Sequence, residues 1–509
     1  MDRLFHPLGR ATFKWHTLLL LTVILVVGAG LRFYGLGLQS LWLDEICTWH
    51  TASHPTLHQV VFEDRAWNMY PPGYLVFMHF IIACFGDTET VLRFPSAVAS
   101  SLSLVVIFLL GARLWTAKEG LVASGLTAAL LFPIYFAQET RPYGMLLLFV
   151  LVATFCWTYV IEDFRRGQRP AWWMLYGYAS AAVLCCYWHY FGLLFIALQG
   201  LGTVLVLVRR RRALLWTLGM YCVIVAAFSP WFPSMWWHWS HQGAGPQNPP
   251  VETGVLVSFF DYVSSLFSHG QTTQSRSRWV TWAVLALLVL VLAHWVWELA
   301  RKWREPEARR GLLLRGAILG VWFLAPFLFA YVKSVTGASV FTHRNLTVSM
   351  PVVYLLTARA LMLIPMPGRT WGRGVLAAVL LAASVVRIVQ SGYYTNPSKD
   401  LFRAAVGVVV KNDQQYENAL VAAYGSLPSC YDYYFKRLGS DRRVEVWAGK
   451  QEHIPQVLEA LQNKGTRYMW YLCATPPPDN AFVTFLNEHF LLKSTWNCFR
   501  VDVYLLEAR

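Results

Sequence analysis

The chain has 509 residues, of which 56% are hydrophobic and 14% are charged, and its formal net charge is +15. This composition excludes an ordinary water-soluble protein and is typical of a chain with many membrane helices. The basic residues lie between apolar runs and form no single stripe or arm, which argues against a nucleic-acid-binding protein.

The first apolar run follows Arg3, Arg10 and Lys14 and lacks a small-residue cleavage site, so we interpret it as a retained membrane span and not as a signal peptide. Apolar stretches of about 20 residues, the length that crosses a hydrocarbon core, recur along the chain. They predict a polytopic α-helical membrane protein with about eleven transmembrane helices, at 17–36, 94–114, 120–137, 143–161, 171–189, 191–208, 213–232, 279–299, 311–331, 346–364 and 374–391.

Pro71–Phe85 is also apolar, but it is short for a crossing and opens with two prolines. We interpret it as an interfacial or re-entrant helix. A full span here would reverse the sidedness of everything that follows and would place the run Arg209–Arg212 outside the cell.

Lys and Arg concentrate in every second loop between the predicted spans, as expected for loops on the cytoplasmic side. This pattern predicts a cytoplasmic N-terminus in the cell (plasma or inner) membrane. It also places 37–93, 233–278 and the tail from Gly392 outside. The basic residues of the cytoplasmic loops are Arg113, Lys118, Arg165, Arg166, Arg169, Arg209–Arg212, Arg301, Lys302, Arg304, Arg309, Arg310, Arg369 and Arg373.

The tail mixes charges with short apolar runs and predicts a small extracytoplasmic α/β domain at 392–509, after a membrane domain at 1–391. Leu401–Lys411 has helical spacing, whereas Ala419–Tyr424 and Tyr468–Leu472 resemble strands. No glycine-rich phosphate loop is visible, so we assign the tail no chemistry. Outside the cytoplasm its three cysteines would allow one disulfide, and the sequence does not choose the pair among Cys430, Cys473 and Cys498.

Two adjacent carboxylates, Asp44 and Glu45, open the first outward loop just after the first span. Acids close to a membrane are costly unless they have a function or a partner. Adjacent side chains on a helix point about 100° apart, so one can face a substrate while a neighbour or a helix cap holds the other. The alternative is an ordinary solvated acid pair at the start of a loop.

The next outward turn, Gln138-Glu139-Thr140-Arg141-Pro142-Tyr143, follows two further crossings and is therefore predicted on the same side as Asp44. Glu139 could orient a metal ion or a sugar hydroxyl, and the planar guanidinium of Arg141 could bind a phosphate. Alternatively, these two side chains simply pair with each other.

His189 lies in the outward turn between the fifth and sixth spans, and Arg344 lies at the outer edge of the tenth span. His189 could bind a metal ion or a phosphate, or it could be a packed residue. Glu139 and His189 supply only two ligands, so a divalent ion would also need water or substrate oxygen. Metal dependence stays open. Arg344 could hold a carrier phosphate or act as a membrane anchor, and Arg32 is a weaker candidate for the phosphate.

The ordered set of motifs resembles the GT-C superfamily of integral membrane glycosyltransferases, in particular the bacterial dolichyl-phosphate-mannose-protein mannosyltransferase-like (PMT-like) group and the related ArnT-like enzymes. The resemblance covers about 17–391. Its landmarks are Ser40-Leu41-Trp42-Leu43-Asp44-Glu45, Tyr70-Pro71-Pro72-Gly73-Tyr74, Gly86-Asp87 with Leu92-Arg93-Phe94-Pro95-Ser96, and the turn Gln138-Glu139-Thr140-Arg141-Pro142-Tyr143.

The resemblance implies transfer of a sugar from a polyprenyl-phosphate donor to a glycan, lipid or protein acceptor. It makes Asp44 the catalytic acid, completed by Glu45, and it makes Tyr70 and Tyr143 candidate substrate-binding residues. The aminoarabinose transferases that modify lipid A have Glu-Lys before the double proline. Here Met69-Tyr70 stands in that place, which puts lipid A modification in doubt.

With Asp44 as general base, the acceptor hydroxyl would displace the carrier phosphate with inversion. Two other classes stay open. A secondary transporter would carry its charges at mid-membrane depth within paired repeats, and no clear repeat is visible. A non-catalytic membrane scaffold would be indifferent to changes at Asp44 and Glu139.

Overall fold

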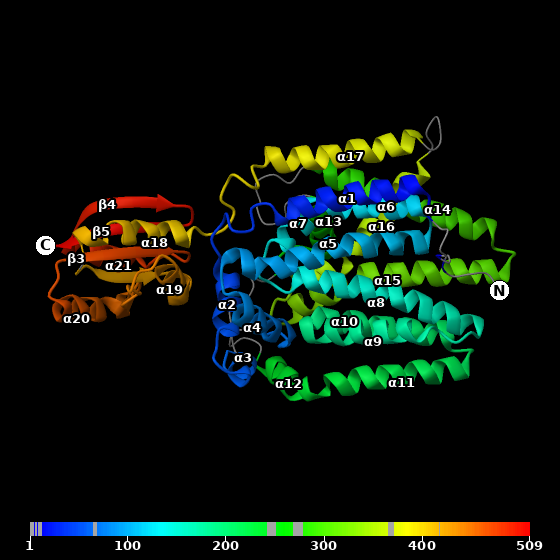
Figure 1. The fold of residues 1–509 in the computed structure, drawn as a ribbon, viewed down its shortest axis with the longest axis horizontal. Coiled ribbons are helices and arrows are strands. Elements are labelled where there is room, and N and C mark those ends of the chain that lie inside the picture. Colours follow the sequence, from blue (N-terminus) through cyan, green and yellow to red (C-terminus); the bar gives the residue numbers. More distant parts are fainter. Residues whose placement is uncertain are drawn as a thin grey trace. The chain divides into compact units, whose positions relative to one another are not determined.

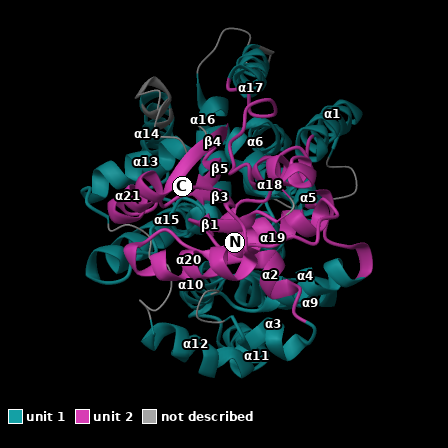
Figure 2. Cartoon of the chain, turned by 90° about the vertical axis from the view of Figure 1, so that its left-hand side faces the viewer, with its two compact units in different colours: residues 1–34, 55–83, 93–390 teal, residues 35–54, 84–92, 391–509 magenta. Residues whose placement is uncertain are grey.

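The structure is a computed structural model that describes residues 5, 8, 13–64, 69–241, 251–267, 278–364, 371–416 and 418–509. The chain divides into two compact units, each assembled from separate stretches of sequence (Figure 2). Unit 1 comprises residues 1–34, 55–83 and 93–390, and unit 2 comprises residues 35–54, 84–92 and 391–509.

Throughout its described residues, unit 1 is helical, and its long helices run side by side (Figure 1). In chain order its elements are α1 (Trp15–Phe33), α3 (Leu57–Phe62), α4 (Gly73–Phe85), α5 (Glu89–Leu114), α6 (Ala117–Ala129), α7 (Leu131–Ala137), α8 (Tyr143–Arg166), α9 (Trp172–Trp188), α10 (Tyr190–Leu207), α11 (Arg211–Phe228), η1 (Ser229–Trp231), α12 (Phe232–Ser240), α13 (Val255–Phe267), α14 (Arg278–Arg301), α15 (Pro306–Thr336), η2 (Asn345–Ser349), α16 (Met350–Leu363) and α17 (Trp371–Gln390).

Among the described residues, eight helices are long and apolar enough to cross a membrane, and the bent pair α6 and α7 makes a ninth. The predicted spans at 171–189 and 279–299 coincide with α9, which has 17 residues, and with α14. The polytopic helical fold with a C-terminal α/β domain is therefore confirmed. Pro71–Phe85, predicted as a short helix, contains the 13-residue helix α4.

The stretch 120–137, predicted as one span, is bent by 61° between α6 and α7. Leu130 has extended backbone angles at the break, and Pro133 follows three residues later. A proline in a continuous helix lacks the N–H for the carbonyl four residues back, here that of Ala129, and its ring clashes with that carbonyl. The helix therefore ends before Pro133 and restarts in a new direction.

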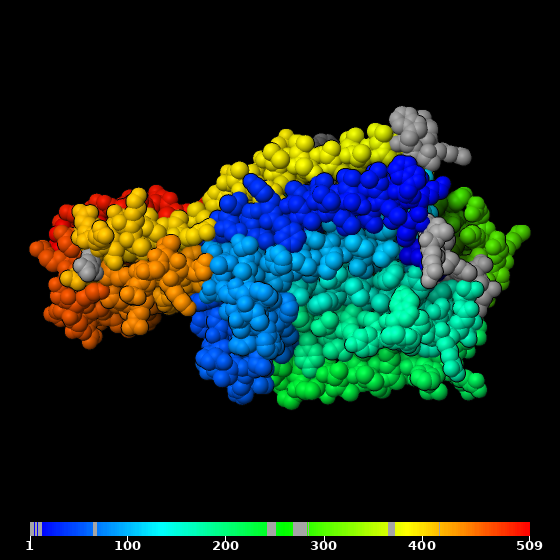
Figure 3. All heavy atoms as spheres, in the orientation of Figure 1, coloured from blue at the N-terminus to red at the C-terminus, as the bar shows by residue number. Residues whose placement is uncertain are grey.

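Helix α1 shows how apolar side chains are distributed on the outside of unit 1. Its exposed side chains include Leu19, Val23 and Val26, and α1 forms part of the blue surface in Figure 3. Its buried positions, Leu21 and Gly28 among them, lie towards neighbouring helices. Gly28 is required there because a Cβ atom would lie 2.9 Å from the Cβ of Ala128 on α6. An apolar exterior of this kind suits contact with lipid.

Unit 2 contains a five-stranded sheet with helices on both faces. Its strand order is β2-β1-β3-β5-β4, with β2, β1 and β3 parallel and β5 antiparallel to both β3 and β4. The elements are α2 (Leu43–Ala52), α18 (Phe402–Lys411), η3 (Asp413–Gln415), β1 (Leu420–Tyr424), α19 (Pro428–Arg437), β2 (Val446–Trp447), η4 (Gln451–His453), α20 (Ile454–Lys464), β3 (Tyr468–Ala474), α21 (Asn480–His489), β4 (Phe490–Cys498) and β5 (Val501–Ala508).

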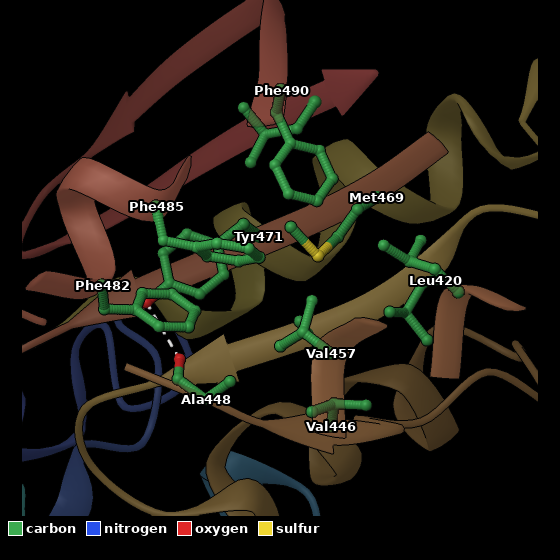
Figure 4. Packing of buried hydrophobic residues seen from close by; sticks show 12 residues of the cluster. Leu420, Val446, Ala448, Val457, Met469, Tyr471, Phe482, Phe485 and Phe490 are labelled. Carbon is green, nitrogen blue, oxygen red and sulfur yellow. Dashed lines mark hydrogen bonds between the residues drawn. The ribbon is translucent and has the colours of Figure 1, made fainter. Parts of the chain in front are cut away.

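One face of this sheet packs against α20 and α21 through alternate residues of the strands (Figure 4). Leu420, Met469 and Tyr471 face Val457 of α20 and Phe482 of α21. The Tyr471 hydroxyl donates to the carbonyl of Ala448 at 3.0 Å, which satisfies the only polar atom of that side chain inside the core. Helices α18 and α19 pack against each other, and α18 contacts β4 and β5.

The predicted helix and strands of the tail are present as α18, β1 and β3. The division by contacts begins the last segment of unit 2 at Ser391 and adds 35–54 and 84–92 to it. The boundary at 391–392 and the extracytoplasmic location stay predictions. Cys430, Cys473 and Cys498 are all free thiols in the structure, so no pair among them is bridged.

Candidate active site

The acid pair lies in the first turn of α2 in unit 2. Asp44 is half-buried, whereas Glu45 is fully buried. The Glu45 carboxylate accepts a hydrogen bond from the backbone N–H of Trp42 at 3.4 Å and so caps the start of its own helix. Negative side chains are stabilised there by the partial positive charge of a helix N-terminus.

Glu45 also forms a buried ion pair with Lys399, with 3.0 Å between the Lys399 Nζ and the Glu45 Oε2. The two side chains are 0% and 6% exposed, so water does little to screen the pair. The two acids therefore differ in environment. Glu45 is buried and binds Lys399 and the Trp42 N–H within unit 2, whereas Asp44, one residue earlier, is partly accessible to solvent.

The second predicted region, the turn 138–142, connects α7 to α8 in unit 1 and is entirely buried. Gln138 positions the turn, because its side-chain amide donates to the carbonyls of Leu31, Arg32 and Tyr34 at the end of α1. Pro142 precedes the first residue of α8 with φ of −67°, a value compatible with entry into a helix. These contacts fix the backbone of the turn that carries Glu139 and Arg141.

Four of the residues predicted from the sequence gather around one imidazole in unit 1. The ring of His189 lies 5.1 Å from that of Tyr70 and 5.7 Å from that of Tyr143, between centroids. The guanidinium carbon of Arg141 lies 5.3 Å from the centroid of the Tyr70 ring. We call Tyr70, Arg141, Tyr143, His189 and Arg344 the His189 cluster. Arg344 is included because its charge acts on the His189 ring.

His189 lies between helices α9 and α10, and its Nδ1 accepts the backbone N–H of Phe191 at 3.1 Å. The pKa of His189 is lowered from its usual 6.5 to about 3, first by burial and then by the charges of Arg141 and Arg344. The nearby Asn345 amide acts in the opposite direction. The ring is therefore neutral at physiological pH, with its proton on Nε2.

The electrostatics of the His189 cluster favour an anion. Two guanidiniums act on one buried imidazole that is neutral at physiological pH. Arg141 is buried and Arg344 is half-buried at the start of η2. Arginine presents a planar set of donors that matches phosphate oxygens, and such contacts strengthen where water is excluded.

The metal assignment to Glu139 and His189 stays a prediction. In the described part of the chain, neither residue belongs to a group of three or more His, Cys, Asp or Glu side chains whose ligand atoms lie close enough to hold one ion. The two residues could supply two donors at most, as expected from the sequence, and the neighbouring arginines oppose a cation.

Arg32, the weaker phosphate candidate, has a structural role instead. Its guanidinium donates to the Ser100 hydroxyl and to the carbonyls of Gly28, Thr127 and Ala128, at 2.6–3.2 Å. The side chain is fully buried and ties α1 to α5 and α6. This assignment is therefore wrong, because the donors are used within the helix bundle.

Asp44 and Glu45 belong to unit 2, whereas Tyr70, Glu139, Arg141, Tyr143, His189 and Arg344 belong to unit 1. Their location at one membrane face stays a prediction. Sequence reasoning missed Lys399, and it named Gln138 only as part of a motif. A lysine in a polar tail looks like a surface residue, and no local pattern links it to an acid 354 positions earlier.

The long apolar helices define a multi-pass membrane protein, and its fold is that of the solved membrane proteins described below. More particularly, residues 69–237 match the family described as dolichyl-phosphate-mannose-protein mannosyltransferase, so the resemblance seen in the motifs is confirmed. No curated protein matches the sequence.

Two groups of solved structures share this fold. ArnT from Cupriavidus metallidurans is similar over 96% of this chain and 97% of its own, with 15% identity and a TM-score of 0.54. The oligosaccharyltransferase of Archaeoglobus fulgidus is similar over 89% of this chain and 67% of its own, with 11% identity and a TM-score of 0.54. At such identities the similarity establishes the fold and not the substrate.

Proposed function

We propose that this protein is a membrane glycosyltransferase that moves a sugar from a polyprenyl-phosphate donor to a glycan, lipid or protein acceptor on the extracytoplasmic side of the cell membrane. The fold and the family match over 69–237 support this class. The ArnT of C. metallidurans has also been solved bound to undecaprenyl phosphate, with a TM-score of 0.52 to this chain, which supports a carrier of the same kind.

The observation that carries the proposal is the His189 cluster, where Arg141 and Arg344 act on a neutral, buried imidazole. A sugar phosphate that loses its sugar gains negative charge on the departing phosphate. Arginines preorganised in a poorly hydrated site stabilise such charge more than they would in water. We therefore assign the carrier phosphate to Arg141 and Arg344, with Tyr70 and Tyr143 beside it.

We assign the general base to Asp44, the accessible member of the acid pair. In the proposed step Asp44 takes the proton of the acceptor hydroxyl, and the hydroxyl oxygen bonds to the anomeric carbon. The bond from that carbon to the phosphate oxygen breaks with inversion, and the electron pair leaves with the polyprenyl phosphate. Glu45 completes the pair, held by Lys399.

The test is transfer by the purified protein in detergent. It is incubated with a panel of polyprenyl-phosphate sugars, and released polyprenyl phosphate is detected by mass spectrometry. Asp44→Asn should fold normally and lose transfer by about a hundredfold or more, the scale of a general base. Exposed Asp441→Asn in the same unit is the matched control.

Full transfer by Asp44→Asn would remove Asp44 from the mechanism. Uptake of a substrate without any glycosylated product would favour the transporter class instead. Indifference of every readout to changes at both Asp44 and Glu139 would favour the scaffold.

A further inference from the structure

We propose that the C-terminal segment of unit 2 is part of the catalytic apparatus, because it holds the helix that carries Asp44, with Lys399 as the positioning residue. This inference rests on the proposed function of Asp44. It concerns unit 2 alone, in which residues 35–54, 84–92 and 391–509 pack together.

The first contact that fixes helix α2 is the ion pair of Lys399 with Glu45. A buried carboxylate is stabilised by a positive partner, and Lys399 supplies one to Glu45, whose side chain is 0% exposed. The same carboxylate caps α2 through the Trp42 N–H. Lys399 thus fixes the first turn of α2, and Asp44 belongs to that turn.

A second set of contacts consists of hydrogen bonds to residues 37–40, which lead into α2. The Gln39 side-chain oxygen accepts from the backbone N–H groups of Ser398 and Lys399 at 3.0 and 3.1 Å, and from the Ser398 hydroxyl at 3.0 Å. Arg403 donates to the carbonyls of Gly37 and Leu38, and its backbone N–H donates to the Ser40 hydroxyl at 3.2 Å. Residues 398–403 therefore fix the direction in which the chain approaches Asp44.

The third set of contacts comes from α19, which packs against α2. The backbone N–H of Leu41 donates to the Tyr434 hydroxyl at 2.6 Å. The neighbouring Tyr433 donates to the carbonyl of Asp87 at 2.7 Å, and its ring lies 4.7 Å from that of Trp49 at the far end of α2. Trp49 itself donates to the Asp87 carboxylate at 3.1 Å.

These contacts reach the approach, the first turn and the last turn of one ten-residue helix. A helix of this length is only marginally stable without tertiary contacts. The orientation of Asp44 is therefore decided by residues about 350 positions later in the chain, and a catalytic group displaced by a fraction of an ångström loses much of its effect.

The test uses the full-length protein and two readouts. Lys399→Met removes the charge and keeps an unbranched side chain. We expect amide hydrogen exchange in 43–52 to accelerate by about tenfold or more, while the sheet strands exchange as before. We also expect kcat to fall by about tenfold to a hundredfold, with the KM for the donor nearly unchanged, because alignment and not donor binding is lost.

Three variants separate positioning from general destabilisation. Lys399→Arg should restore much of kcat, because it keeps the charge. The double variant Glu45→Gln, Lys399→Met should show slower exchange in α2 than Lys399→Met alone, because it removes the buried carboxylate together with the lysine charge. Lys464→Met breaks the more exposed ion pair with Glu445 in the same unit and should change neither readout. If Lys399→Met does not fold, Tyr434→Phe is the milder test of the same helix.

Unchanged exchange in α2 together with unchanged kcat, in either Lys399→Met or Tyr434→Phe, would overturn the inference. Wild-type protein that transfers no sugar from any donor would overturn the proposed function and the inference with it. If the wild type transfers sugar and Lys399→Met matches it in both kcat and exchange, the inference is overturned but the proposed function stands.

Discussion

At the scale of single residues, burial decides what each polar side chain of the candidate site can do. The imidazole of His189 is 2% exposed and lies under the influence of two arginines, so it is neutral although histidine is usually half-protonated near pH 6.5. Glu45 is fully buried as well, but Lys399 compensates its charge. The same property, loss of water, thus neutralises one group and requires an ion pair for the other.

The depressed pKa of His189 predicts a pH-dependent stability. The unfolded chain binds a proton to this ring below about pH 6.5, whereas the folded chain does so only near pH 3. Protonation therefore favours the unfolded state, and stability is lost as pH falls from about 6.5 towards 3. In detergent, wild type should lose more thermal stability between pH 7.5 and pH 5 than His189→Gln does.

The control for this measurement is His489→Gln, which changes an exposed histidine on unit 2. It should retain the wild-type dependence on pH. An identical loss of stability in wild type and in His189→Gln would show that His189 is not the group responsible.

Removal of one guanidinium from the His189 cluster should weaken carrier binding. A hydrogen bond to a charged group contributes about 1.5–3 kcal/mol, so Arg344→Gln should raise the Kd for polyprenyl phosphate by about tenfold to a hundredfold. Arg166→Gln, which changes an exposed arginine at the end of α8, should bind like wild type. Equal affinities for all three proteins, measured by titration in nanodiscs, would exclude Arg344 from the phosphate site.

At the scale of elements, helix ends and breaks build the site. The turn that carries Glu139 and Arg141 exists because helix α6 ends before Leu130 and the seven-residue helix α7 that follows ends before Gln138. Gln138 then donates to the carbonyls of Leu31, Arg32 and Tyr34 at the end of α1, where the helix itself supplies no further turn of N–H donors. One side chain thereby joins the start of the turn to the end of the first span.

Gln138→Leu should therefore destabilise the helix bundle. It removes the amide that donates to the carbonyls of Leu31, Arg32 and Tyr34, of which the contact to Arg32 is buried. The loss of such a buried hydrogen bond costs about 1–3 kcal/mol. We expect a lower midpoint of thermal unfolding in detergent, whereas Gln390→Leu, at the exposed end of α17, should behave as wild type. An unchanged midpoint in Gln138→Leu would show that water or another donor replaces the amide.

At the scale of the whole molecule, the proposed reaction requires a defined topology. The distribution of Lys and Arg predicts that the N-terminus is cytoplasmic and that the chain after Gly392 is outside. Alkaline phosphatase fused after Arg509 should therefore be active, and green fluorescent protein at the same position should be dark. Fusions after Arg166 should give the opposite result. A fluorescent C-terminal fusion would contradict the predicted sidedness and the proposed function.

Much of the fold could be predicted because the underlying signals are local. Apolar length predicts spans whatever their neighbours are, and the short apolar runs at 419–424 and 468–472 predict β1 and β3. The bend at Leu130 could have been suspected from Pro133, but its angle depends on the helices around it. The sheet order could not be predicted, because pairing of β1 with both β2 and β3 is a long-range choice.

The sequence by itself determined that this is a polytopic membrane protein with a C-terminal α/β domain, and it singled out Tyr70, Arg141, Tyr143 and His189 as candidates. Only the tertiary structure decided that the first three gather around the neutral imidazole of His189, and that Glu45 is held by Lys399. The reason is physical. Hydrophobic length is a property of a segment, whereas burial and the pairing of charges depend on residues that are distant in sequence and close only after folding.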